Sequence, residues 1–202
     1  RSESVEPGPE LATALLYAMK TETRGGETTY SALDRRVLTW LTRRADPELL
    51  AEIEDAPLSR EYYGDLVLAL QNTFLYDDIA FCLLPRAEGP EIVGEVADLL
   101  IRSRDIRRVF CGAMVDEDVL ISVRTAENGG NATQLLRRTI KGLGYGGGHT
   151  HRSGGKVAGV CLGDRVPTDV VEELRARWLA ACGVDRQRGT RLIRKQEIVK
   201  NL

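Results

Sequence analysis

The chemically richest part of the sequence is a glycine-rich segment over residues 142–156, because it combines glycines with histidines and cations. Its candidate ligand-binding residues are Gly146, Gly147, Gly148, His149, His151, Arg152, Ser153, Gly154 and Lys156. Consecutive glycines let backbone N–H groups converge on an anion, since no Cβ blocks the approach. The segment therefore predicts a loop that cradles a phosphate. A flexible surface loop without a ligand is the open alternative, because a glycine-rich stretch alone is weakly specific.

Arg124 supports the phosphate hypothesis, because it follows a strand predicted over residues 119–123. Strand ends commonly present ligand-binding groups, and a guanidinium can donate two parallel hydrogen bonds to a phosphate. Arg137, Arg138 and Lys141 lie on the helix predicted before the glycine segment and extend the positive charge toward a phosphodiester chain. Ordinary solvated surface charges are the alternative for all four residues.

Metal ligands are scarce in this sequence. Its two histidines, His149 and His151, have no neighbouring carboxylate, whereas a two-metal phosphoesterase site needs several Asp and His ligands. Upstream, Glu22 within Thr21-Glu22-Thr23 is the candidate carboxylate, and a lone glutamate at a helix end is its simpler interpretation. The four cysteines form no C-x-x-C pair, which predicts reduced thiols in a cytoplasmic protein and argues against a zinc site. We expect no metal in these residues.

The composition is typical of a globular protein, with 202 residues, 43% of them hydrophobic and 29% charged. A formal charge of -2 gives no overall attraction to nucleic acid or acidic membranes, so anion binding has to come from a local patch. Aromatic residues make up 5% of the chain, without an evident stacking platform for a single strand, which favours a mono- or dinucleotide ligand. No segment has the apolar length of a membrane span.

Four helices are predicted within residues 9–74, and each begins at a recognisable signal. Pro9 suits a first helical turn, Ser31 can cap the second helix, Asp46-Pro47 starts the third, and the fourth starts after Ser59. Apolar residues then recur at helical spacing in each segment. The fourth helix is a candidate connector between two lobes.

The second half reads as strand, helix, hairpin, helix, strand and helix, which predicts an α/β fold with a mixed sheet flanked by helices. The predicted segments are a buried strand over 79–84, a helix over 90–103, a hairpin over 109–115 and 119–123 with one buried face, a helix after Asn131, a strand over 157–162 and a helix from Pro167 to Gly183. The glycine segment thus lies between a helix and a strand, which would hold its two ends in place.

Together these residues resemble the DHH family of phosphoesterases, in the branch of nanoRNase/pAp phosphatases and exopolyphosphatase-related proteins, which is akin to RecJ exonucleases. Residues 146–149, reading GGGH, and the following Ser153-Gly154 pair look like the glycine-histidine signature of the DHH-associated C-terminal domain. Residues 121–124, reading ISVR, look like the strand that precedes this signature. Residues 11–25 are similar to the segment that leads into the family's threonine-aspartate-threonine motif.

The resemblance implies the last, helical part of a catalytic DHH domain over residues 1–57, a connector helix over 58–74 and a DHH-associated substrate-binding domain over 75–202. Two departures matter: Glu22 replaces the motif aspartate, and the sequence contains no Asp-His-His or Asp-x-Asp motif. Because the family's metal motifs lie upstream and this chain starts at Arg1, we expect a fragment of a longer protein. The missing lobe would hold manganese, and this chain alone would be inactive.

By the same resemblance, Arg124, the glycine segment and His149 hold the substrate phosphate in a cleft between two lobes. The activity implied for the whole protein is manganese-dependent hydrolysis of short RNA, pAp or a related nucleotide phosphoester, in the cytoplasm, with a homodimer as a candidate assembly. One alternative is a catalytically inactive nucleotide- or nucleic-acid-binding module, which Glu22 at the metal-motif position favours. Another is an unrelated α/β domain with an idle glycine loop.

Overall fold

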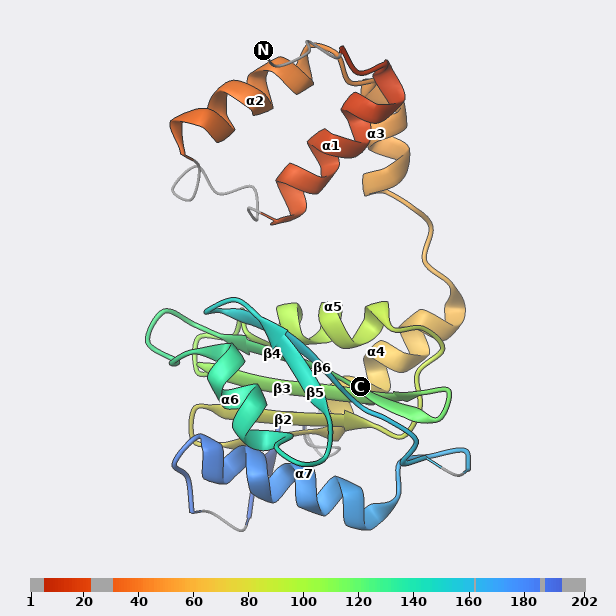
Figure 1. Ribbon diagram of the computed structural model, residues 1–202. Helices are drawn as coiled ribbons and strands as arrows, with labels where there is room; N and C mark the ends of the chain where they lie inside the picture. The colour runs from red at the N-terminus through yellow and green to blue at the C-terminus, as the bar shows by residue number, and fades with distance from the viewer. Residues whose placement is uncertain (1–5, 23–30, 162, 186–187, 194–202) are drawn as a thin grey trace. The chain divides into compact units, whose positions relative to one another are not determined.

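The computed structural model describes residues 6–22, 31–161, 163–185 and 188–193, and the chain divides into two compact units, Arg1–Leu58 and Ser59–Leu202 (Figure 1). Thr23 of the threonine-glutamate-threonine motif and residue 162, at the end of the strand predicted over 157–162, lie outside the described residues. Among the helices that the structure describes, none combines the length and the apolar character that crossing a membrane requires.

The first unit is helical in its described part, with α1 (Pro9–Glu22), α2 (Ala32–Thr42) and α3 (Pro47–Glu54). Ser31 caps α2 through reciprocal hydrogen bonds with Asp34, and Asp46 caps α3, so the predicted helix starts are confirmed. The hydroxyl of Thr13 accepts a hydrogen bond of 2.9 Å from the backbone N–H of Asp46, which ties α1 to the start of α3. The buried core of this unit consists of Ala12, Leu16 and Leu41.

The second unit contains the helices α4 (Arg60–Asn72), α5 (Glu91–Leu100), α6 (Ala132–Thr139) and α7 (Thr168–Ala181). Its strands are β1 (Thr73–Tyr76), β2 (Ile79–Leu84), β3 (Arg108–Val115), β4 (Asp118–Thr125), β5 (Tyr145–Gly148), β6 (Arg152–Val157) and β7 (Thr190–Arg191). Within the described residues they form one seven-stranded sheet in the order β5-β6-β4-β3-β2-β1-β7. Strands β2 and β3 run parallel, and the other neighbours run antiparallel. The predicted α/β fold, a mixed sheet flanked by helices, is confirmed.

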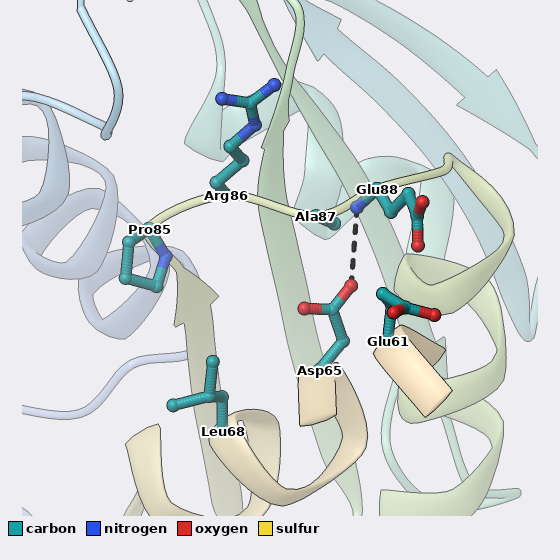
Figure 2. Close-up of a pocket in the computed structure, with 7 residues that line it drawn as sticks. All are labelled: Glu61, Asp65, Leu68, Pro85, Arg86, Ala87 and Glu88. Atoms are coloured by element: carbon teal, nitrogen blue, oxygen red, sulfur yellow. Dashed lines mark hydrogen bonds between the residues drawn. The ribbon is translucent and has the colours of Figure 1, made fainter. Parts of the chain in front are cut away.

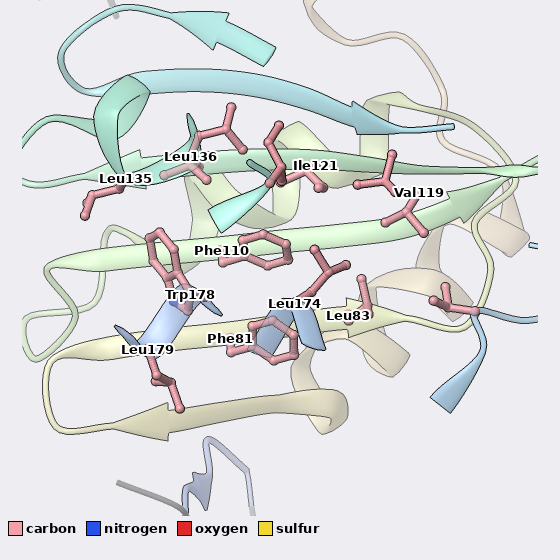
Figure 3. Close-up of a cluster of buried hydrophobic side chains, with 14 of the residues drawn as sticks. Phe81, Leu83, Phe110, Val119, Ile121, Leu135, Leu136, Leu174, Trp178 and Leu179 are labelled. Atoms are coloured by element: carbon pink, nitrogen blue, oxygen red, sulfur yellow. The ribbon is translucent and has the colours of Figure 1, made fainter. Parts of the chain in front are cut away.

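The central strands β2, β3 and β4 are buried on both faces of the sheet (Figure 1). On one face α4 and α5 cover a core that includes Cys82 and Cys111. On the other face, Phe110 stacks on Phe81 with ring centroids 5.1 Å apart and lies 5.7 Å from the ring of Trp178 on α7 (Figure 3). The predicted β3–β4 hairpin is confirmed, but the expectation that one of its faces is buried is wrong, because helices pack on both sides of the sheet.

Helix α4 lies within the second unit, although its sequence position suggests a connector. Ser59 caps the helix by accepting a hydrogen bond of 3.0 Å from the N–H of Tyr62. Ala69 is fully buried against the sheet, and the hydroxyl of Thr73 donates to its carbonyl at 2.7 Å. Helix α4 therefore runs directly into β1 and packs on β2. The division into residues 1–57, 58–74 and 75–202 stays a prediction.

The glycine segment forms a β-hairpin, so the prediction of a loop followed by a strand over 157–162 is wrong: the strand is β6, which ends at Val157. Strand β5 pairs antiparallel with β6 at the edge of the sheet, and β6 pairs with β4. The glycines let α6 approach closely, because a Cβ at Gly155 would lie 3.1 Å from Ile140 and 3.2 Å from Leu136. Pairing and helix packing thus hold this segment in the sheet without the usual β-branched residues.

We predict opposite effects of alanine at two adjacent glycines of β5. A Cβ at Gly146 would lie 2.7 Å from the carbonyl oxygen of Gly154, so Gly146→Ala should lower the free energy of unfolding by about 1–3 kcal/mol through overpacking. At Gly147 the nearest atom would be a guanidinium nitrogen of Arg137 at 3.9 Å, so Gly147→Ala should change stability by less than about 0.5 kcal/mol. Urea denaturation followed by circular dichroism measures both, and equal losses would contradict the hairpin geometry.

Candidate functional site

Arg124 lies near the end of β4, as the sequence predicts, and its guanidinium is held in place by hydrogen bonds. Its Nε and Nη2 atoms donate to the two carboxylate oxygens of Asp98 at 2.9 and 3.2 Å. Its Nη1 atom donates to the hydroxyl of Ser122 at 2.6 Å. The Arg124 side chain is 11% exposed, so this bidentate pair is largely shielded from water.

Arg152 joins the same cluster from the neighbouring strand. It lies directly opposite Arg124 in the β4–β6 pairing, and opposite residues of an antiparallel pair share one face of the sheet. Its Nη2 atom lies 3.4 Å from Asp98, and its Nε atom has no hydrogen-bond partner among the described residues. Two arginines therefore share one carboxylate, and Arg152, with a side chain 32% exposed, is the more accessible of the two.

Asp98 is a functional candidate that the sequence analysis missed. It lies on α5, whose other residues give a strong apolar pattern, and its partner Arg124 is 26 positions further along the chain. A single acidic residue on a helix is ordinarily a solvated surface group. The signal that could have identified it is the arginine placed directly after a predicted strand of the sheet, because a guanidinium that becomes buried there needs a carboxylate partner.

The tip of the β5–β6 hairpin carries both histidines and is anchored at several points. The N–H of His149 donates to the carbonyl of Arg152 at 2.6 Å, and the N–H of Thr125 donates to the carbonyl of His151 at 3.1 Å. The hydroxyl of Thr133, at the start of α6, donates to the His149 carbonyl at 2.9 Å. Both histidines are exposed. The structure thus brings them to the sheet end where Arg124 and Arg152 lie.

The glycines adopt a geometry different from the predicted cradle. Gly146, Gly147 and Gly148 are extended strand residues paired with β6, so their N–H groups alternate in direction and do not converge on one point. Gly154 is exposed on the face that carries Arg152. Ser153 points to the opposite face, where it is buried and its hydroxyl donates to the carbonyl of Gly147 at 3.0 Å, so it is unavailable to a ligand on the arginine face.

The remaining predicted cations lie further from the cluster. Lys156 stands at the far end of β6 in an ion pair with Asp118. The hydrogen bond from Lys156 lowers the pKa of the Asp118 carboxyl, and the same bond raises the pKa of Lys156. Arg137 reaches the edge strand at Gly147, whereas Arg138 on α6 is exposed. Arg137 and Lys141 are exposed as well, and among these residues Arg137 is the one whose guanidinium would contact a side chain at Gly147.

The described residues do not fit a metal centre. Glu22 is an exposed residue at the end of α1 in the first unit. Throughout residues 6–22, 31–161, 163–185 and 188–193, no three His, Cys, Asp or Glu side chains come together as metal ligands. Burial raises the pKa of the Cys182 thiol to about 12, which keeps it protonated rather than available as a thiolate ligand. The described residues therefore supply no ligand set for a manganese pair, which the resemblance places in a lobe outside this chain.

A cavity of about 380 Å³ lies elsewhere in the second unit, between α4 and the segment after β2 (Figure 2). Glu61, Asp65 and Glu88 line it, and the Asp65 carboxylate accepts a hydrogen bond of 3.3 Å from the Glu88 N–H. Arg86 is the one cationic residue in its lining. Three carboxylates repel an anion, so this cavity is unsuited to a phosphate despite its size.

Comparisons with known proteins establish the fold. No family model matches the sequence. An uncharacterized protein of Methanocaldococcus jannaschii is 26% identical over 186 residues, which cover 89% of this chain and 38% of that protein. A solved exopolyphosphatase-related protein from Bacteroides fragilis superposes with a TM-score of 0.63 at 17% identity, over 87% of this chain and 52% of that chain. This chain shares its fold with that exopolyphosphatase-related protein.

The chain spans about half the length of the exopolyphosphatase-related structure and a smaller part of the archaeal relative. A pGpG-specific phosphodiesterase from Vibrio cholerae aligns over 90% of this chain with a TM-score of 0.41 and 12% identity. A score at that level does not establish a common fold. The similarity to the exopolyphosphatase-related protein therefore concerns the architecture, and the chemistry has to be argued from the site.

We predict that Asp98→Asn destabilises the second unit, because two partly buried guanidiniums lose their counter-charge. The expected loss of unfolding free energy is about 1–3 kcal/mol, the usual cost of leaving a buried hydrogen-bonding group without its partner. Glu172→Gln is the matched control, since Glu172 pairs with Arg175 on the exposed face of α7 and such pairs contribute less than about 1 kcal/mol. Equal stabilities of the two variants in urea would contradict the central role of Asp98.

Proposed function

We propose that this chain binds the phosphate of a nucleotide or short oligonucleotide, as the substrate-binding part of a larger phosphoesterase. The observation that carries the proposal is the cluster of Arg124, Asp98 and Arg152 beside the exposed backbone of Gly154. The fold that this chain shares with an exopolyphosphatase-related protein also supports a ligand that carries phosphate. The resemblance of residues 146–149 to the DHH-associated signature gives the same class of ligand.

Charge balance supports Arg152 as the direct phosphate contact. The cluster has two guanidiniums and one carboxylate, which leaves one net positive charge. Arg124 donates to both oxygens of Asp98 and to Ser122, whereas Arg152 makes a single contact of 3.4 Å with Asp98. Arg152 therefore keeps donors for a charge-assisted hydrogen bond to a phosphate oxygen. In this proposal Arg124 positions Asp98, and Asp98 orients Arg152.

The two histidines complete the proposed anion site. His149 and His151 are exposed at the hairpin tip, and the Nδ1 atom of His151 lies 3.4 Å from the hydroxyl of Thr125 at the end of β4. An imidazole N–H can donate a hydrogen bond to a phosphate oxygen. Their backbone anchors hold the tip next to Arg152, so the two imidazoles and this guanidinium stand at one end of the sheet.

Hydrolysis is assigned to the rest of the larger protein, since the described residues here do not fit a metal pair. For that protein we propose manganese-dependent cleavage of short RNA, pAp or a related nucleotide phosphoester. This chain's own contribution is to bind and orient the phosphate, which lowers the entropic cost of bringing the phosphorus to the reacting group.

A catalytically inactive nucleotide-binding module is the second candidate function. Glu22 in place of the aspartate of the family's motif favours it, because the longer glutamate side chain would present its oxygens at a different position. Both candidates require the same phosphate site in this chain. They differ in whether the larger protein hydrolyses what the site binds.

We predict that Arg152→Ala weakens binding of AMP by about 1.5–3 kcal/mol, the usual contribution of a hydrogen bond to a charged group. Arg175→Ala should leave the affinity unchanged, because Arg175 is paired with Glu172 on α7, away from the hairpin. Isothermal titration calorimetry of the unaltered chain and both variants measures the difference. Unaltered affinity in Arg152→Ala would remove the proposed phosphate site.

We also predict that the 202-residue chain does not hydrolyse pAp when manganese is added, because the described residues offer no ligand set for two metal ions. The assay follows phosphate release with and without a chelator, and AMP binding to the same sample shows that the chain is folded. Chelator-sensitive hydrolysis of pAp by the purified chain would refute the proposal that this chain binds the phosphate and another part of the larger protein cleaves it.

A further inference from the structure

We infer that the open face of the β5–β6 hairpin binds a planar ring, and that Tyr145 is the residue that selects ligands carrying one. This inference rests on the proposed function, because it adds a ring-binding subsite next to the phosphate site. It implies a ligand class with an aromatic base attached to a phosphorylated backbone, as opposed to a bare phosphate or polyphosphate.

The pairing register places the required groups on one face of the sheet. Tyr145 lies opposite Lys156, Gly147 lies opposite Gly154, and two residues further along β6 Arg152 lies opposite Arg124 of β4. Alternate residues of a strand share a face, so these side chains and the two glycines face the same way. The surface therefore has a cation at one end, an aromatic ring at the other and two glycines between them, with a guanidinium nitrogen of Arg137 beside Gly147.

The packing does not require glycine at the two positions that form this bare strip. A Cβ at Gly154 would meet the carbonyl oxygen of Ile121 at 3.8 Å, and a Cβ at Gly147 would meet Arg137 at 3.9 Å, both ordinary contacts. Neither residue has a positive φ. By contrast, a Cβ at Gly146 or Gly148 would lie within 2.7 Å of backbone atoms of β6. Two residues without side chains of their own leave a flat stretch of backbone on which a ring can stack.

Tyr145 is suited to complete this surface. Its side chain is 67% exposed, and it takes no part in the buried cores of the described residues. An exposed tyrosine offers a large rigid face at low entropic cost, and base–aromatic stacking tolerates any base. Along β6 the four-residue step from Arg152 to Lys156, opposite Tyr145, spans about 13 Å, which is the scale of a dinucleotide.

The test compares two probes of equal charge, the 5′-phosphorylated dinucleotide pApA and its abasic analogue, which keeps the sugar-phosphate backbone and lacks the bases. We expect the chain to bind pApA at least about fivefold more tightly than the analogue, as stacking of one base predicts. Tyr145→Ala should reduce this ratio to near one. Gly154→Val should do the same, because a valine fills the strip while suiting a strand.

Two matched variants complete the design. Tyr145→Phe keeps a ring and should retain the preference for pApA, and Tyr63→Ala removes a 54% exposed tyrosine on α4 and should also retain it. If the analogue binds as expected but pApA binds no better, or if Tyr145→Ala and Gly154→Val keep the full preference, the ring subsite is wrong and the phosphate site stands. If neither probe binds, the proposed function fails and the inference fails with it.

Discussion

Burial of β2, β3 and β4 on both faces is the constraint on which the rest of the second unit depends. Helices cover these strands from either side, so a charged side chain among them needs a partner before it can be buried. Arg124 meets this requirement through Asp98 and Ser122. The polar groups that could bind a ligand therefore lie at the strand ends and on the β5–β6 hairpin. There Gly154 is exposed on the face that carries Arg124 and Arg152.

The carboxylate of Asp98 connects this burial requirement to ligand binding. One carboxylate cannot neutralise two guanidiniums, and the excess positive charge falls on Arg152, the more exposed partner. Attraction between charges is stronger where protein excludes water, so a half-buried cation draws an anion more strongly than a solvated one. Lys156 makes the contrast clear, because Asp118 already balances its charge. The carboxylate that holds Arg124 thus leaves part of the positive charge of Arg152 for an anionic ligand.

Local signals in the sequence were enough to predict the helix cap at Ser31, the helix start at Asp46-Pro47 and the position of Arg124 at a strand end. They fail where structure comes from distant partners. Strand β6 reads RSGGKV, which lacks β-branched alternation, and its strand character comes from pairing with β4 and packing under α6. Asp98 gives no local signal, because its role exists only once α5 lies over β4.

The glycine run combines two physical roles that its sequence cannot separate. Gly146 and Gly155 allow α6 and the neighbouring strand to approach, which is a packing requirement. Gly154 has room for a side chain and lies two residues from Arg152 on the same face, about 7 Å along the strand. The two-residue period of β6 therefore fixes the spacing between charge and open backbone. The phosphate of a ligand would contact Arg152, and the group attached to it would lie over the backbone of Gly154. Binding of this kind does not need backbone N–H donors that converge on the phosphate.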